Sequence, residues 1–297
     1  MEINQNSLAA LFTGYNMVFQ QAFSAIENDY EDIAMTVPST TAQEVYAWLG
    51  QTTRFREWIG DRVVQNLESH DFTIKNKDWE NTVKVSRNSI EDDTYGLYKP
   101  SMAQLGQDSA KHPGELVWGL IGKGFNAKCY DGQYFFDTDH PVLNEDGSFS
   151  SVSNFGGGSG PAWYLVDNTR IIKPIIYQQR KPYTFVALDK DTDANVFNRK
   201  EFVYGVDARS NVGFGLWQLA YASKQPLDED SYAAARQAMM ELKGDNGKPL
   251  DINPSLLIVP PSMEKQAKKI LVAEHGANGA TNIFQNTAKL KVSRWLK

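Results

Sequence analysis

Residues 72–87 read FTIKNKDWENTVKVSR, and their pattern is the strongest indication of architecture in the chain. Apolar residues alternate with polar ones near both ends of this stretch, at Phe72, Ile74, Val83 and Val85. This period of two is typical of a β-strand with one buried face. Residues 76–78 (Asn-Lys-Asp) between the two apolar pairs are typical of a turn. The pattern predicts a long hairpin over residues 63–87. Because a two-stranded ribbon is marginally stable alone, this hairpin needs support from elsewhere.

An amphipathic helix is predicted before this hairpin. From residue 8, apolar side chains recur at steps of three and four residues, at Leu8, Leu11, Phe12, Tyr15, Val18, Phe19, Ala22, Phe23 and Ile26. We expect a helix over residues 5–27. A polar stretch follows at residues 39–41, so the helix has the character of a detached arm. We expect this arm to reach a neighbouring subunit.

Two helical stretches follow the hairpin, at residues 101–105 and 115–121. Between them stand His112, Pro113 and Gly114, and a proline breaks or kinks a helix. One kinked long helix and two short helices are both compatible with this pattern. Residues 155–161 are rich in glycine and predict a flexible joint or loop. Beyond them, residues 163–206 contain short β-rich runs separated by turn residues, so we expect mostly sheet there.

The last part of the chain predicts a helix, a strand and a second helix. The expected elements are a helix over residues 232–243, a turn at 244–247, a buried strand at 255–259 and a helix over 262–274. Elements of these lengths form a compact αβα unit that buries the strand between layers. The chain as a whole is therefore predicted to be an α+β protein.

Composition excludes several classes of protein. Of the 297 residues, 41% are hydrophobic and 22% charged, which is typical of a packed globular chain and excludes disorder as its main state. The net charge of -6 provides no basic field to attract nucleic acid, so a dedicated DNA-binding domain is not expected. A single cysteine, Cys129, cannot form an internal disulfide. No signal peptide and no run of about 18 apolar residues is found, so no membrane partner is predicted.

The densest polar cluster is Asp137-Thr138-Asp139-His140-Pro141. Two carboxylates and an imidazole are able to bind a divalent ion or share protons. The same sequence is also typical of an Asx-type turn before proline, which is the favoured interpretation. A nucleophilic pair of Cys129 with His140 is a weaker alternative, because it requires an orienting group and an oxyanion hole.

Other motifs point away from catalysis and cofactor binding. The glycines at 156–160 lack the lysine and hydroxyl of a phosphate-binding loop, so no nucleotide and no other cofactor is predicted. The seven tryptophans are scattered through all segments, which favours packing or interfaces over a stacking platform. Lys75 and Lys77 are interpreted as surface residues. An isopeptide cross-link from either lysine is an alternative that needs a nearby catalytic carboxylate.

The order of these parts resembles the major capsid protein of tailed phages, and several motifs make the resemblance specific. The sequence is similar to the Mu-like prophage major head subunit family in stretches that run nearly from the arm to the C-terminus: residues 46–50 (YAWLG), 55–60 (FREWIG), 90–93 (IEDD), 130–133 (YDGQ), 136–141 (FDTDHP), 199–202 (RKEF), 205–209 (GVDAR) and 256–261 (LLIVPP).

This resemblance implies the Hong Kong 97-type capsid fold. By position, residues 1–56 correspond to the N-terminal arm, 57–92 to an extended β-hairpin loop that overlies a neighbour, 93–225 to the peripheral domain and 226–297 to an axial αβα unit. Residues 101–125 take the place of the spine helix. A structural and non-enzymatic role is implied. Hexamers and pentamers would form an icosahedral shell around double-stranded DNA, which the shell contacts weakly and without sequence specificity.

The implied partners are further copies of the chain in neighbouring capsomers, with scaffold, portal and decoration proteins as possible additions. The implied location is the virion, and the host cytoplasm before assembly. Candidate residues for contacts between subunits are Leu8, Phe12, Phe19, Phe72, Ile74, Lys75, Lys77 and Trp79. An encapsulin-like compartment or another phage structural subunit is an alternative. A metal-dependent hydrolase that uses Asp137, Asp139 and His140 is a remote one.

Overall fold

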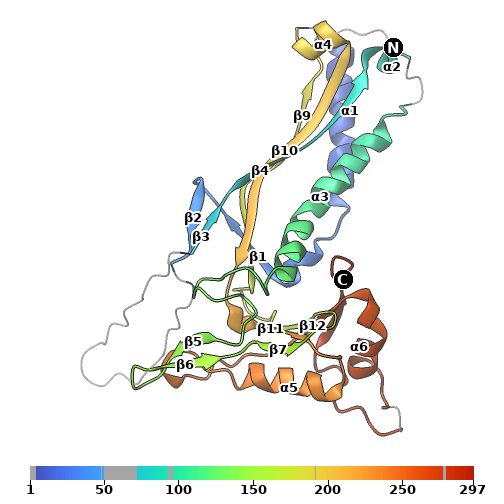
Figure 1. The fold of residues 1–297 in the computed structure, drawn as a ribbon. Helices are drawn as coiled ribbons and strands as arrows, with labels where there is room; N and C mark the ends of the chain where they lie inside the picture. The colour runs from blue at the N-terminus through green and yellow to red at the C-terminus, as the bar shows by residue number, and fades with distance from the viewer. Residues whose placement is uncertain (1–4, 48, 50–71, 93–95, 191, 277–278) are drawn as a thin grey trace.

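Two larger sheets organise the chain in the computed structural model, which describes residues 5–47, 49, 72–92, 96–190, 192–276 and 279–297 (Figure 1). The first sheet has the strand order β1 (Ala34–Pro38), β9 (Ile175–Leu188), β10 (Glu201–Phe214) and β4 (Lys77–Ser86). The second has the order β13 (Lys289–Val292), β12 (Leu256–Val259), β8 (Trp163–Val166), β11 (Ala220–Lys224) and β7 (Phe155–Gly158). The predicted α+β class is confirmed.

The long strands β9 and β10 form the spine of the first sheet. They pair antiparallel, with Gly205 opposite Val186, and β1 joins the other edge of β9 in parallel. The register of β9 and β10 shifts between Asp207 and Ser210, which is a bulge-like irregularity of the kind that bends a strand. β4 completes the sheet by pairing antiparallel with β10 along its whole length.

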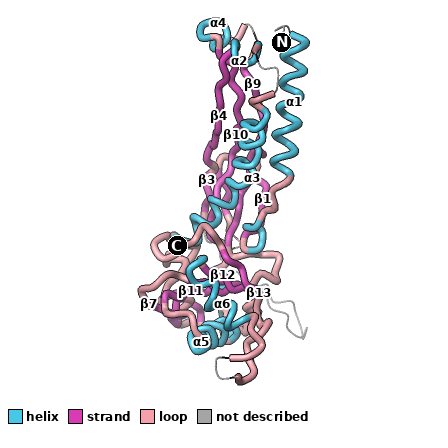
Figure 2. The backbone as a smooth tube through the Cα atoms, turned by 90° about the vertical axis from the view of Figure 1, so that its right-hand side faces the viewer, coloured by secondary structure: helices cyan, strands magenta, loops and turns pink. Residues whose placement is uncertain are grey.

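Two long helices cover one face of this sheet, α1 (Gln5–Ser24) and α3 (Lys99–Gly122), and they lie side by side against the strands in Figures 1 and 2. The helix predicted over residues 5–27 is confirmed. Its expected detachment is wrong, because the apolar stripe of α1 is buried within the same subunit. The ring of Phe19 stacks on Phe185 at 5.3 Å, and Tyr15 meets Tyr204 edge-on at 5.2 Å.

α3 is one continuous helix with Pro113 inside it, which decides between the two alternatives left open by the sequence. Proline removes one backbone hydrogen bond from a helix interior. Gly106 lies where α1 crosses α3, and a Cβ at this position would be 2.5 Å from the carbonyl oxygen of Phe19. The glycine therefore lets the two helices approach closely.

The predicted hairpin over residues 63–87 is wrong in its pairing. Residues 73–75 form β3, which pairs with β2 (Gln43–Val45), whereas β4 pairs with β10. Asn76 is not a turn residue, because its amide is buried: Nδ2 donates to Ser39 Oγ and to the Thr41 carbonyl, both at 2.9 Å. The chain thus passes from one sheet to the next at Asn76. Residues 63–71 of that hairpin and the motif at 55–60 lie outside the described residues.

The second sheet is flanked by α5 (Glu229–Met240) and α6 (Glu264–Leu271), as expected for an αβα unit. Asp228 begins α5 with a capping box, in which its side chain and that of Ser231 bond to each other's backbone N–H groups. Strands β7, β8 and β11 also belong to this sheet, although they precede residue 226. The sheet therefore extends across the predicted boundary between residues 225 and 226.

The glycine-rich segment forms strand β7 and not the predicted flexible joint. A Cβ on Gly156 would lie 2.9 Å from the hydroxyl of Tyr221, and one on Gly158 would lie 2.3 Å from the backbone of Lys224. These glycines therefore allow close packing of β7 against β11. Gly158 also has φ of +94°, a conformation that favours glycine.

The remaining elements are short. They are β5 (His140–Leu143), β6 (Phe149–Val152), α2 (Arg87–Glu91), α4 (Ala194–Arg199) and the 3-10 turns Asp29–Asp32, Trp217–Leu219, Asp245–Gly247 and Pro261–Met263. One hydrophobic core joins the second sheet to the C-terminal end of α3, and a second core lies between α1, α3 and the first sheet. No helix within the described ranges is both long and apolar enough to cross a lipid bilayer.

Candidate functional site

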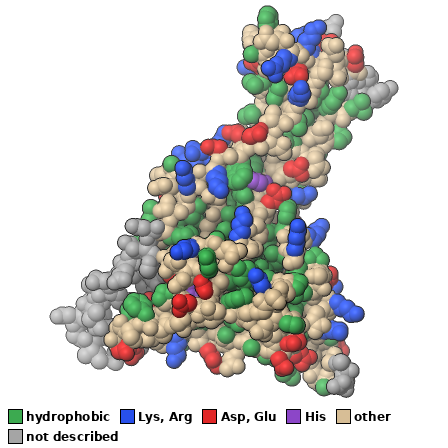
Figure 3. Space-filling view, in the orientation of Figure 1, with side chains coloured by type: hydrophobic (Ala, Val, Ile, Leu, Met, Phe, Trp, Pro, Cys, Tyr) green, Lys and Arg blue, Asp and Glu red, His purple; other side chains and the backbone are tan. Residues whose placement is uncertain are grey.

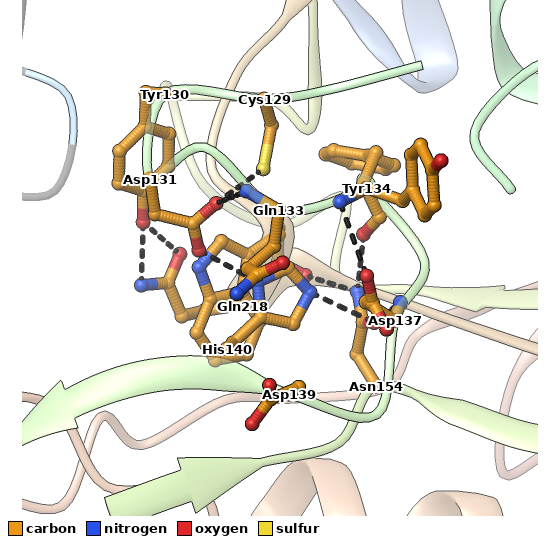
Figure 4. Close-up of polar contacts among 12 residues, drawn as sticks. Cys129, Tyr130, Asp131, Gln133, Tyr134, Asp137, Asp139, His140, Asn154 and Gln218 are labelled. Carbon is orange, nitrogen blue, oxygen red and sulfur yellow. Dashed lines mark hydrogen bonds and ion pairs between the residues drawn. The ribbon is translucent and has the colours of Figure 1, made fainter. Parts of the chain in front are cut away.

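A buried polar cluster lies beside the second sheet and includes His140 from the motif that the sequence singled out (Figure 4). His140 Nδ1 is 2.6 Å from Asp131 Oδ2, and Cys129 Sγ donates to Asp131 Oδ1 at 3.0 Å. The imidazole is completely buried and stacks on the indole of Trp217 with ring centroids 4.0 Å apart. The site thus connects residues 129–140 to the 3-10 turn Trp217–Leu219, which comes much later in the chain.

Both ring nitrogens of His140 have a polar partner. Its Nε2 faces Asn154 Oδ1 at 3.2 Å. The orientation of the Asn154 amide is fixed, because Nδ2 donates to the carbonyl groups of Phe135, Trp217 and Ala220. Both ring nitrogens of His140 therefore face oxygen acceptors, and Nδ1 contacts the Asp131 carboxylate in a buried pair.

The same contacts shift the pKa of Asp131. Burial is the largest single influence and raises the pKa of the carboxyl group, but the hydrogen bonds from His140, Cys129 and the Gln133 N–H, together with the interaction with His140, outweigh it. The net result is a pKa of Asp131 below its ordinary value. The ion pair is therefore a structural contact that holds the Cys129–His140 region in place.

The cluster does not have the arrangement of a nucleophilic pair. Burial and the negative charge of Asp131 raise the pKa of the Cys129 thiol, which disfavours the reactive thiolate. Asp131 lies between the thiol and the imidazole, so His140 does not receive the thiol proton directly. The alternative of a Cys129–His140 nucleophile is therefore not supported by the geometry.

The same three side chains place a sulfur, an oxygen and a nitrogen within 4.8 Å of one another. Ligands at about 2.0–2.3 Å from a tetrahedral zinc ion are roughly 3.2–3.7 Å apart. The Asp131 and His140 atoms are closer than this, at 2.6 Å, and are directly hydrogen-bonded. The observed geometry is that of a closed hydrogen-bond network.

The two carboxylates predicted to act with His140 point elsewhere. Asp137 accepts hydrogen bonds from the backbone N–H groups of Thr138 and Tyr134, at 2.7 and 3.2 Å. Asp139 is exposed and accepts from the hydroxyl of Ser151 at 2.6 Å. The favoured interpretation as a turn therefore agrees with the structure. The three residues of the remote hydrolase hypothesis do not form a common site.

The predicted contact residues fall into two groups. Lys75 and Lys77 are exposed, whereas Leu8, Phe19 and Ile74 are buried within the subunit. Leu8 and Phe19 belong to the core between α1, α3 and the first sheet. Ile74 packs with Tyr46, Leu49 and Ile176 in a small separate cluster. Phe12, Phe72 and Trp79 are partly buried.

A shallow pocket of about 220 Å³ lies beside Trp79, between β4 and α3. Trp79 Nε1 donates to the Ser210 carbonyl at 2.9 Å, and its indole packs edge-on against the ring of His112. His112 Nδ1 is 2.6 Å from the hydroxyl of Tyr183. Burial lowers the pKa of His112, which favours its neutral form at this wall of the pocket.

The sequence interpretation missed Asp131, Asn154 and Trp217 as members of the cluster. Asp131 had a local signal, because Asp131-Gly132 is a turn dipeptide within one of the family-like stretches, and Gly132 has φ of +84°. Asn154 and Trp217 had no local signal in the sequence. Their role depends on contacts across 14 and more residues of sequence.

Sequence comparisons identify relatives along nearly the whole chain. A family model described as Mu-like prophage major head subunit gpT matches residues 8–296. The Mu-like prophage FluMu major head subunit of Haemophilus influenzae is 44% identical over 279 residues, which cover 92% of this chain and 91% of that protein. The major capsid protein of Escherichia phage Mu is 38% identical over 289 residues, 95% of each.

Solved structures show the same fold. A chain from the procapsid of bacteriophage JBD30 has a TM-score of 0.89 and 41% identity, with 99% of this chain and 100% of that chain covered. A chain from the JBD30 capsid decorated with minor capsid protein trimers has a TM-score of 0.76 and 32% identity, with 92% of each covered. The predicted Hong Kong 97-type fold and non-enzymatic role are confirmed by these relatives. Because the chain shares its fold and extensive sequence identity with these relatives along almost its full length, it belongs to the Mu-like prophage major head subunit family.

Proposed function

We propose that the chain assembles with copies of itself, as hexamers and pentamers, into an icosahedral shell that encloses double-stranded DNA. The observation that carries this proposal is the match over 99% of the chain to a subunit of an assembled procapsid, at a TM-score of 0.89. The sequence relatives in Haemophilus influenzae and phage Mu are a head subunit and a capsid protein. They favour a virion shell over the encapsulin-like alternative.

The proposed contacts between subunits lie on the exposed parts of the predicted elements. The short ribbon of β2 and β3 stands at the side of the molecule in Figure 1 and carries exposed Lys75. We propose that this ribbon, which includes part of the loop predicted at residues 57–92, overlies a neighbouring subunit, whereas β4 from the same range pairs with β10 inside the subunit. Lys77 and the partly buried Phe12, Phe72 and Trp79 remain contact candidates on this basis. The assignment of residues 93–225 and 226–297 as peripheral and axial regions is likewise part of the proposal.

The charge distribution supports weak and non-specific contact with packaged DNA. The net charge is -6, and basic and acidic side chains are interspersed over the face shown in Figure 3. Phosphate binding requires clustered Lys or Arg side chains. Strong binding would hinder packaging and release. The proposal places the protein in the host cytoplasm before assembly and in the virion afterwards. A scaffold, a portal and decoration proteins are its proposed partners.

Electron microscopy of the untagged protein, expressed alone and with the proteins encoded beside it, tests the proposal. Closed shells, tubes or rings of five and six subunits are the expected products. Extraction of nucleic acid from particles made during phage growth distinguishes a virion from a compartment, because a compartment carries protein cargo. A subunit that stays monomeric under all these conditions would refute self-assembly. A high-affinity, salt-sensitive shift of DNA by the subunit would contradict the proposed weak contact.

A further inference from the structure

The loop between β8 and β9, residues 167–174, presents the most exposed large hydrophobic side chain among the described residues. Ile171 has 94% of its surface accessible. A single exposed apolar residue is ordinary on a protein surface. What distinguishes this one is that the loop beneath it is held by several hydrogen bonds, four of them to the buried carboxylate of Asp167.

Asp167 is the anchor of the loop. Its side chain is completely buried, and its carboxylate accepts hydrogen bonds from the N–H and hydroxyl of Thr169 at 3.0 and 2.6 Å. It also accepts from the backbone N–H of Asn253 at 3.1 Å and pairs with Arg170 Nε at 3.2 Å. Four donors thus fix one carboxylate, which ties the start of the loop to the segment before β12.

The other polar side chains of the loop are also occupied inside the subunit. Arg170 donates to the carbonyl groups of Leu250 and Asp251, and Lys173 donates to the carbonyl of Asn168. Ser255 Oγ donates to Asn168 Oδ1 at 2.7 Å. With these polar groups engaged internally, the exposed side chain of the loop that has no polar group to satisfy is Ile171.

We propose that Ile171 is an anchor residue of a contact between two copies of this chain, and that it inserts into an apolar surface of the neighbouring copy. This inference rests on the proposed shell function. A shell subunit meets other copies of itself on several sides, so a second copy is the expected occupant. Rigid apolar side chains are effective anchors, because binding does not have to order them.

The loop geometry makes Asp167 and Arg170 positioning residues for this contact. Loss of the Arg170 side chain removes the bonds to Leu250 and Asp251 and frees the loop without changing Ile171 itself. The contact is then expected to weaken through the entropy of ordering the loop. An apolar contact also predicts that assembly through Ile171 depends little on salt concentration.

The test compares shell or capsomer formation by four proteins: the natural chain, Ile171→Lys, Ile171→Leu and Arg170→Ala. Burial of an isoleucine corresponds to about 10- to 100-fold in an association constant, so Ile171→Lys is expected to raise the subunit concentration needed for assembly at least about tenfold. Ile171→Leu is expected to assemble like the natural chain, and Arg170→Ala to fall between them. Light scattering and sedimentation measure assembly.

Circular dichroism and thermal unfolding of each unassembled subunit control for folding. If Ile171→Lys does not fold, Ile171→Thr replaces it, because threonine keeps the branched shape and lowers the apolar area. Equal assembly by the natural chain and a folded Ile171→Lys or Ile171→Thr variant overturns this inference and leaves the shell function intact. Absence of assembly by the natural chain itself would overturn the shell function, and this inference with it.

Discussion

At the scale of single residues, the Asp131–His140 pair shows why a buried charge is retained in this protein. A buried ion pair is often no more stabilising than apolar residues of the same shape. Removal of one partner is costly, because the other charge remains buried without a partner. Here the carboxylate has three donors, the thiol of Cys129, the backbone N–H of Gln133 and the imidazole. The pair therefore fixes one arrangement of the surrounding loop.

Asp131→Asn is expected to lower the free energy of unfolding at neutral pH by about 3–5 kcal/mol, the cost of breaking a buried pair. The pKa of Asp131 in the folded protein is lower than in the unfolded chain, where it is about 3.9. Its stabilising contribution is therefore present above that value and is lost as the pH falls through the folded pKa. Urea unfolding of the unassembled subunit between pH 2 and pH 7 measures both effects.

The difference between the natural chain and Asp131→Asn is the informative quantity, because other carboxyl groups titrate in both proteins. It should shrink as the pH falls through the acid range. Asp139→Asn is the matched control, since Asp139 is exposed and outside the pair. A difference that stays constant from neutral to acid pH would show that Asp131 does not act through its charge.

At the scale of elements, α1 is a core helix of the subunit. Phe19 has 1% of its surface exposed and packs on Phe185, whereas Met17 on the same helix is 68% exposed. Phe19→Ala is expected to lower the free energy of unfolding by about 3–5 kcal/mol, and Met17→Ala by less than about 0.5 kcal/mol. Chemical unfolding of the unassembled subunit measures this contrast. Equal and small effects would mean that α1 is detached in solution.

The crossing of α1 and α3 depends on one glycine, and α3 contains its own control. Gly106→Ala places a Cβ against the Phe19 carbonyl and is expected to destabilise by about 1–3 kcal/mol through overpacking. A Cβ on Gly119 meets nothing within 4 Å, so Gly119→Ala is expected to stabilise by up to about 1 kcal/mol through helix propensity. Thermal or urea unfolding gives both values. The same sign for both substitutions would contradict the close crossing.

At the scale of the whole molecule, the two larger sheets do not have fully separate interiors. The main core contains Trp118 of α3 and Tyr177 of β9 together with residues of the second sheet, such as Leu257. One ion pair reinforces this junction: Lys291 Nζ of β13 pairs with Asp32 Oδ2, which lies in the 3-10 turn before β1, at 2.9 Å. A shared core couples the stability of the two regions.

The unassembled subunit is therefore expected to unfold in one cooperative transition, with tryptophan fluorescence and far-UV circular dichroism coinciding. Leu257→Ala in the second sheet is expected to move both signals together, by about 2–5 kcal/mol. Met240→Ala on the exposed face of α5 is the control. Two separate transitions, with only one displaced by Leu257→Ala, would show that the sheets fold independently.

Periodicity along the chain was sufficient for the longer helices, for strands such as β9, β10 and β12 and for the α+β class, because a buried face repeats every 3.6 or every two residues whichever surface packs against it. The family-like stretches were sufficient for the fold type. The turn before Pro141 was also predictable, since its hydrogen bonds are made within a few residues. Local chemistry alone determines the periodic elements and this turn, whereas the fold type followed from the resemblance to the family.

Pairing and burial were decided only by the tertiary structure. Alternation in residues 72–87 is the same whether the partner is an adjacent strand or β10, so the sequence did not reveal that β3 and β4 belong to different sheets. The stripe of α1 likewise does not specify whether its own subunit or a neighbour covers it. The ion pair of His140 depends on Asn154 and Trp217, which only the folded chain brings together. The sequence determines the elements, and long-range packing selects their partners, because the apolar pattern of a helix or strand is the same whichever surface packs against it.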